Sequence, residues 1–278
     1  MNTATESEPK PMSPESTSPK STSKDPLNPN ELPFVAPCKE LDTFAAIGWL
    51  KLGWQDMKRA PKQSLSYGAV MLLISYFVTT ISYIIGDIYL LVAMLSGFLL
   101  MGPVLAIGMY SVSCQLQKHL VPRLGYCLRE GWRHIHNELI FAAILLIVFL
   151  VWARAAAMLH VFFPVEAKPE LKDLLMFLGI GSAVGTIFGA IIFSAAAFSL
   201  PMIMDKKVDM VTAIVTSINA VLRNKLAMLV WASIIVLFIV IGFMTALLGL
   251  VILLPLIGHA TWHGYLETIE ANVWPEHD

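Results

Sequence analysis

Charged residues are scarce in this chain of 278 residues: they make up only 14% of it, whereas 56% of the residues are apolar. Soluble domains carry about 25% charged residues, so this chain has too little polar surface to cover a water-soluble fold. The formal net charge of −1 argues against nucleic acid as a partner. The mean hydropathy of +0.69 indicates a membrane protein. We therefore expect the lipid bilayer, and no nucleic acid, as a partner.

Cysteines and the short motifs of catalysis are also few. Cys38, Cys114 and Cys127 form no CxxC pair and no other ligand pattern, so we expect isolated reduced thiols. The sequence contains no Walker loop, no GxSxG and no dinucleotide-binding fingerprint. No soluble segment is long enough to hold an active site. These absences favour a protein that is not an enzyme, and they predict no bound cofactor.

The N-terminal segment has almost no apolar residues. Residues 1–33 contain seven prolines, six serines and four threonines. Such a segment cannot bury enough surface to offset its ordering entropy, and it lacks the apolar core of an export signal. We expect residues 1–35 to form a disordered cytoplasmic tail. A polytopic membrane domain follows over residues 36–270, with a short C-terminal tail over residues 271–278.

Long uncharged blocks fill the membrane domain, and a helix needs roughly 20 residues to cross a bilayer. The last block, Leu226 to Gly258, has 33 residues without a charge. One helix of that length would reach about 50 Å, too long for one crossing, so we expect a break near Thr245–Gly249. The sequence thus predicts an all-α membrane protein with six transmembrane helices, or five without the break. The predicted spans are about 65–85, 88–112, 139–161, 174–202, 225–244 and 248–268.

The charges of the predicted loops alternate along the chain. Loops rich in lysine and arginine alternate with loops that have no excess positive charge, and positive loops stay in the cytoplasm. Both termini should therefore be cytoplasmic. The positive loops contain Lys51, Lys58, Arg59 and Lys62, then Lys118, Arg123, Arg129 and Arg133, and finally Lys206, Lys207, Arg223 and Lys225.

A weak threefold repeat groups the spans into three helical hairpins. An amphipathic segment precedes each predicted hairpin, at residues 45–68, 122–142 and 209–232, and is suited to lie in the inner membrane interface. The second span of each hairpin carries a proline, which frees a carbonyl one turn earlier and predicts a kink. These prolines are Pro103, Pro201 and Pro255. The tryptophans expected in the interface are Trp49, Trp54, Trp132, Trp231 and Trp262.

Small residues line one face of the predicted fourth span. Gly181, Gly185 and Gly189 recur every four residues, and such a stripe lets another helix approach closely. The stripe predicts helix packing, either inside the monomer or between two copies of the chain.

Arg154 is the one charge well inside a predicted span. A guanidinium near the bilayer centre costs about 2.5 kcal/mol or more, so it should face protein or a water-filled cavity. One interpretation is a transport or charge site that contacts an anion. The other is that Arg154 extends along the neighbouring alanines and pairs with Asp87, Glu166 or Asp173.

Two histidines, His259 and His263, lie four residues apart near the end of the last span. On a helix this spacing puts them on one face, where they supply half of a tetrahedral metal shell. The HExxH motif is absent, because Ala260 holds the glutamate position. The pair is either a polar cap at the membrane interface or part of a transition-metal or haem site.

Four stretches of the chain resemble a known family: GWQDMKRAPKQSLSYG, GPVLAIGMYSVS, PMIMDKKVDMVTAIVTSINAVLRNKLAMLVWA and LPLIGHATWHGY. The chain is similar, over about residues 40–270, to an uncharacterised family of bacterial predicted integral membrane proteins. The family is a domain of unknown function, and some members are labelled cytochrome-oxidase-related. The resemblance implies a bacterial inner-membrane location and a six-span core, and it implies no activity.

Two functions fit these observations. The first is a non-enzymatic membrane component that assists the assembly or organisation of another membrane complex. The second is a small transporter or channel that uses Arg154. A metal- or haem-binding protein associated with the respiratory chain is a further alternative.

Overall fold

The computed structural model describes residues 33–85, 106–123, 135–162 and 171–276. Throughout these ranges the regular structure is helical, with two isolated β-bridges. The helices are α1 (Ala45–Arg59), α2 (Pro61–Ile85), α4 (Ile107–Gln117), α6 (Ile135–Phe162), α7 (Leu171–Ala196), α8 (Ser199–Asp205), α9 (Met210–Arg223), α10 (Lys225–Met244) and α11 (Leu250–Thr268).

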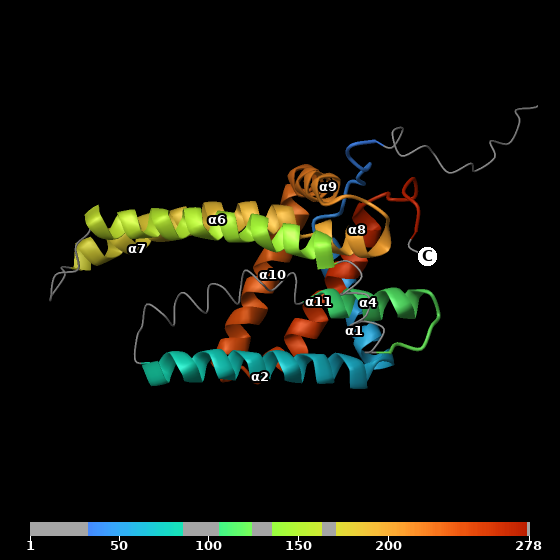
Figure 1. The fold of residues 1–278 in the computed structure, drawn as a ribbon, viewed down its shortest axis with the longest axis horizontal. Coiled ribbons are helices and arrows are strands. Elements are labelled where there is room, and N and C mark those ends of the chain that lie inside the picture. Colours follow the sequence, from blue (N-terminus) through green and yellow to red (C-terminus); the bar gives the residue numbers. More distant parts are fainter. Residues whose placement is uncertain (1–32, 86–105, 124–134, 163–170, 277–278) are drawn as a thin grey trace, which may run out of the picture.

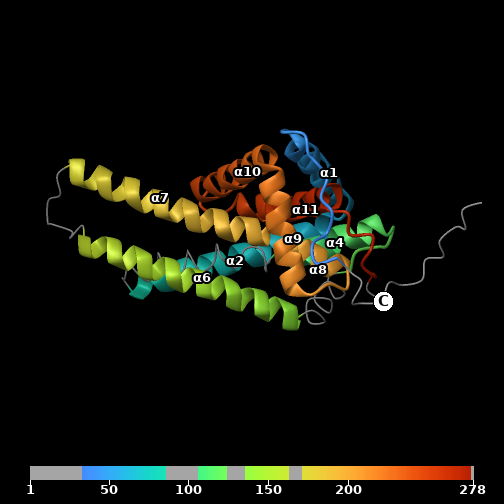
Figure 2. The same cartoon turned by 90° about the horizontal axis from the view of Figure 1, so that it is seen from above.

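Three long helices, α2, α6 and α7, extend in one direction from a compact head, which consists of α1, α8, α9 and the C-terminal half of α11. Figure 1 shows α6 and α7 running side by side to the left, with α2 pointing the same way in a lower layer. The view from above, in Figure 2, shows the same direction for α2, α6 and α7, whereas Figure 1 shows α10 running steeply between the upper and the lower layer. Most of the buried hydrophobic residues belong to the head or to the helix ends that meet it.

Three helices among the described residues are long and apolar enough to cross a membrane: Pro61–Ile81, Gly179–Asp205 and Lys225–Met244. They overlap the first, fourth and fifth predicted spans. The predicted third span falls on α6, where the apolar helix Leu139–Ala155 is shorter, and most of the predicted second span lies outside the described residues. The predicted sixth span is helical as α11, but it is not among the three. Six spans are therefore not confirmed.

The predicted break between the last two helices is confirmed. α10 ends at Met244 and α11 begins at Leu250, so the long apolar block folds back on itself. Ala246 and Leu247 take positive φ angles of 51° and 68°, a strained choice for residues with side chains. The turn is held by backbone and side-chain bonds: the Leu247 amide donates to the Gly242 carbonyl at 2.8 Å, and the Gly249 amide donates to Thr245 Oγ1 at 2.9 Å.

The predicted prolines differ in their positions. Pro255 lies inside α11, where its missing N–H leaves the Val251 carbonyl without its usual donor one turn earlier. Gly68 of α2 packs directly against that carbonyl, so closely that a Cβ on Gly68 would overlap it. Pro201 lies in the first turn of α8, just after the non-helical residue Phe198. A proline is tolerated in a first turn, because the backbone N–H groups there have no partner within the helix. Pro103 lies outside the described residues.

The prediction that tryptophans lie exposed in the membrane interface is wrong for three of them. Trp49, Trp231 and Trp262 are all fully buried. Trp49 stands edge-on to Trp231, with ring centroids 5.6 Å apart, and forms part of the head core. Of the four predicted interfacial tryptophans that the structure describes, Trp54 alone keeps an exposed side chain, 42% accessible, and Trp132 lies outside the described residues. The physical reason is that α11 covers the face of α1 that carries Trp49 and leaves the face with Trp54 open.

The two ends of the described chain pair with each other beside the head. The Lys39 amide donates to the Thr268 carbonyl, and the Glu270 amide donates to the Pro37 carbonyl, both at 2.9 Å. Further along, Lys206 pairs with Glu276 both through a β-bridge and through an ion pair of 3.0 Å. The residues ahead of α1 are thus tied to those after α11.

Candidate functional site

A buried cluster of polar side chains lies where four helices meet. It consists of Asp56 on α1, Ser64 on α2, Ser113 on α4, and His259 and His263 on α11. His259 and Ser64 are fully buried, and Asp56 is only 5% exposed. We call these five residues the polar cluster.

Glycines bring the backbones close enough for these short side chains to meet. A Cβ on Gly53 of α1 would lie 2.8 Å from the Ala260 amide nitrogen. On α11, a Cβ on Gly258 would lie 2.7 Å from Met109 Cβ of α4. Such distances exclude any larger residue without movement of a helix. The helices α1, α2 and α4 are therefore held tightly around α11, which carries both histidines.

The contacts of the polar cluster form a continuous chain. His263 Nε2 lies 2.8 Å from Asp56 Oδ2, which also accepts from Ser113 Oγ at 2.8 Å. Ser113 Oγ in turn lies 2.7 Å from His259 Nδ1, and His259 Nε2 lies 2.9 Å from Ser64 Oγ. Ser64 ends the chain by donating to the Ala60 carbonyl at 2.9 Å.

The number of protons determines which of these contacts are made together. A neutral imidazole has one N–H, so with the proton on Nδ1 His259 donates to Ser113 and accepts from Ser64. Ser64 then gives up its bond to Ala60. With both nitrogens protonated, His259 donates to both serines, and Ser64 and Ser113 donate onward to Ala60 and Asp56. The two states differ by the rotation of the Ser64 hydroxyl.

Asp56 supplies the negative charge of the polar cluster. Burial raises the pKa of Asp56, but the hydrogen bonds from His263 and Ser113, together with the charges of the two histidines, outweigh that effect and lower the pKa below its ordinary value. Asp56 is therefore held as a carboxylate. It is the residue of the cluster that the sequence analysis missed most plainly. The signal was its spacing from Trp49 and Gly53, which places all three on the face of α1 that α11 covers.

The predicted metal or haem site at His259 and His263 stays a prediction. Both ring nitrogens of His259 contact serine oxygens, and His263 Nε2 contacts Asp56. Within the described ranges, no group of three or more His, Cys, Asp and Glu side chains is arranged to hold a metal ion. The structure joins the two histidines through Asp56 and Ser113. Ser64 and His259 are in contact, but both side chains are fully buried, so the Ser64 hydroxyl is not accessible from outside.

The other predicted site residues lie away from the polar cluster. Arg154 is on α6 with an exposed side chain. Asp87 and Glu166 lie outside the described residues, as does the side chain of Asp173, so the expected pairing with Arg154 stays a prediction.

The predicted glycine stripe is on α7 and faces open space. A Cβ built on Gly181, Gly185 or Gly189 meets no other atom of the described chain within 4 Å. Packing of this stripe inside the monomer is thus not seen among the described residues. Packing against another chain stays a prediction.

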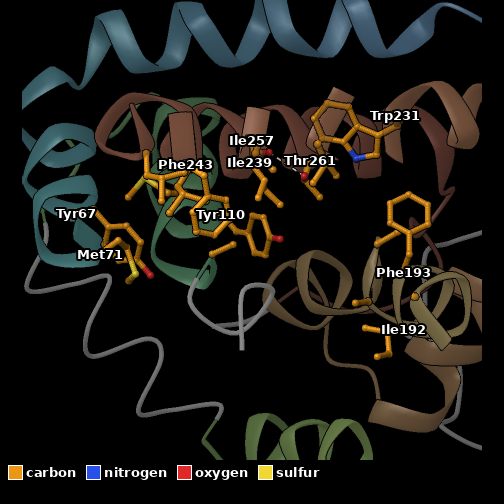
Figure 3. Close-up of a pocket in the computed structure, with 18 residues that line it drawn as sticks. Tyr67, Met71, Tyr110, Ile192, Phe193, Trp231, Ile239, Phe243, Ile257 and Thr261 are labelled. Carbon is orange, nitrogen blue, oxygen red and sulfur yellow. Dashed lines mark hydrogen bonds between the residues drawn. The ribbon is translucent and has the colours of Figure 1, made fainter. Parts of the chain in front are cut away.

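An apolar cavity of about 280 Å³ lies beside the stripe, and Gly189 is part of its wall. Figure 3 shows Tyr67, Met71 and Tyr110 on one side of it and Ile192 and Phe193 on another. Helices α2, α4, α7, α10 and α11 all contribute to the lining, which is almost entirely apolar. The hydroxyl of Thr261 donates to the Ile257 carbonyl of its own helix at 2.8 Å. This cavity accepts apolar groups.

Comparison with known proteins relates part of the chain to a family of membrane proteins. Residues 90–205 match the model of a family described as predicted integral membrane protein (DUF2189). The resemblance to an uncharacterised family of membrane proteins is therefore confirmed over that part of the chain. No curated protein and no solved structure matches the chain.

Proposed function

We propose that this integral membrane protein is a non-enzymatic component that assists the assembly or organisation of a membrane complex. In this proposal α7 receives a transmembrane helix of a partner membrane protein. The supporting observation is the open glycine stripe of α7, which leads into an apolar cavity at Gly189.

Helix association inside a bilayer depends on close packing, because lipid tails are as apolar as the side chains that leave them. A stripe of glycines lets a second backbone approach, and van der Waals contact then stabilises the pair. The cavity beside the stripe offers room for apolar side chains of the arriving helix.

The test is the substitution Gly185→Leu. It should leave the fold intact, because a Cβ at this position meets no described atom within 4 Å and because leucine favours a helix over glycine by about 1 kcal/mol. It should weaken association about tenfold, equal to about 1.4 kcal/mol, since the side chain holds the two backbones apart. A photo-reactive residue at Ser182, beside the stripe, reports contacts in native membranes, and mass spectrometry identifies the crosslinked chain.

The matched control is Ala183→Leu, which adds the same side chain on the opposite face of α7. It should leave the crosslinks unchanged. Crosslinks from Ser182 to lipid alone, or crosslinks to a membrane protein that persist at full yield in Gly185→Leu, would contradict the proposal.

We also propose that the protein lies in a bacterial inner membrane with both termini in the cytoplasm. The alternation of positive and non-positive loops supports this orientation. Topology reporters fused at Met1 and after Asp278 should report the same side of the membrane. Reporters on opposite sides would overturn the arrangement of three hairpins.

A further inference from the structure

Helix α9 has its apolar face on the outside. Val211 and Leu222 are 55% and 57% exposed, and Ile214, Val215 and Ile218 are partly exposed along the same stripe. Their spacing of three and four residues places all five on one face. A surface helix of a soluble protein buries such a face.

The opposite face of α9 points into the protein and combines core apolar residues, such as Met210 and Ala213, with the hydroxyl groups of Thr216 and Ser217. Thr216 Oγ1 accepts from the Ala36 amide at 3.1 Å. Ser217 Oγ accepts from the Phe198 amide at 3.0 Å and donates to the Ser194 carbonyl at 2.7 Å. These buried bonds fix the rotation of α9, because turning the apolar stripe inward would leave all of these polar groups without partners.

The place of α9 in the chain limits where it can lie. It connects two helices that can cross a membrane, Gly179–Asp205 and Lys225–Met244, and only Asn224 separates it from the second. Its 14 residues reach about 21 Å, short of the roughly 30 Å hydrocarbon core. Figure 1 shows α9 nearly end-on while α7 runs across the view, so the two helices cross at a large angle.

We infer that α9 lies in the plane of the membrane, with its outer stripe immersed where the lipid headgroups meet the acyl chains. The partner is therefore the bilayer surface. The exposed Arg223 and Lys225 lie at the end of α9 where α10 enters the membrane, at the level of lipid phosphates. In this position the apolar stripe of α9 contacts lipid and is not exposed to water.

The experiment places nitroxide labels on the outer stripe and measures their accessibility to oxygen and to a water-soluble nickel chelate. Val211→Cys and Leu222→Cys are made in a chain whose own cysteines are serine, reconstituted in vesicles of phosphatidylethanolamine and phosphatidylglycerol. Glu40→Cys, in an exposed segment ahead of α1, is the aqueous control. We expect oxygen to reach both stripe labels several-fold better than nickel, and the reverse at residue 40.

Two other outcomes would overturn the inference. Nickel access at the stripe equal to that at residue 40 would mean that α9 faces water. Low access to both reagents would mean that a second copy covers the stripe. Because the cysteine-free chain can fail to fold, a second measurement uses the unaltered protein in vesicles that contain a diazirine acyl-chain lipid. Labelling should fall on Val211, Ile218 and Leu222, and labelling of Thr212 or Thr216 instead would contradict the orientation.

Discussion

Two glycines of α1 should respond oppositely to the same substitution. Gly48 and Gly53 lie five residues apart on one helix, but a Cβ on Gly48 meets nothing within 4 Å, whereas a Cβ on Gly53 meets the backbone of α11 at Ala260. Alanine favours a helix over glycine by about 1 kcal/mol at both positions. Gly48→Ala should therefore raise the free energy of unfolding by about that amount.

Gly53→Ala gains the same propensity but places its methyl group 2.8 Å from the Ala260 nitrogen and 3.1 Å from its Cα. A helix backbone cannot rotate aside as a side chain can, so α1 must move away from α11. Overpacking of this kind costs about 1–3 kcal/mol. Because the propensity gain cancels in the comparison, Gly53→Ala should be about 1–3 kcal/mol less stable than Gly48→Ala.

Thermal unfolding in detergent, followed by circular dichroism and by the fraction that remains monodisperse after heating, measures the difference. Asp56 lies almost one turn beyond Gly53, so movement of α1 should also break its contact with His263. Equal stability of the two alanine variants would refute the close packing of α1 on α11.

Three further predictions concern Gly68, Asp56 and Arg154. Gly68→Ala should destabilise the protein by about 1–3 kcal/mol in thermal unfolding, because its methyl overlaps the Val251 carbonyl, and unchanged stability would contradict that packing. Because the pKa of folded Asp56 is lowered, its stabilising effect is complete above its ordinary value of 3.8 and is lost as the pH falls through the lower folded value. Asp56→Asn should therefore cost about 1–3 kcal/mol at neutral pH and flatten the acid limb of a stability curve, whereas an unaltered acid limb would show that another group governs it. Arg154→Ala should leave ion flux into vesicles unchanged, because the side chain lies exposed on α6; a loss of flux would favour the transporter alternative.

The reversal before α11 could be predicted from sequence because it depends on a length. An uncharged block of 33 residues exceeds one crossing, and the turn formed within the expected residues, Thr245–Gly249. The predicted span 225–244 coincides with α10, because Lys225 marks where the apolar run begins.

The polar cluster could not be predicted in the same way. Its residues come from four helices, and Asp56 and His263 are 207 residues apart in sequence. The i, i+4 spacing of the histidines places them on one face of α11, but it does not reveal which helix covers that face. The structure places an aspartate and two serines against the two histidines, and none of these three residues is near them in sequence.

The positions of the tryptophans and glycines in the fold could not be predicted either, because both residue types suit more than one environment. Tryptophan is suited both to a membrane interface and to a packed core, and Trp49 belongs to the core. The regular glycines of α7 meet no other part of the described chain, whereas the isolated Gly53 and Gly258 make close contacts. A regular spacing of glycines indicates a helix face that another helix can approach closely. It does not indicate whether a helix of the same chain packs against that face.

The pairing of α1 with α11 has a consequence for biosynthesis. The first helix leaves the ribosome long before the last, and until then Asp56 and the indole of Trp49 have no cover from α11. A nascent chain that stops before Leu250 would display a carboxylate and a large aromatic ring at the bilayer surface, where quality-control proteases can recognise them. We therefore expect chains truncated ahead of Leu250 to be less stable than the full chain and to be degraded faster.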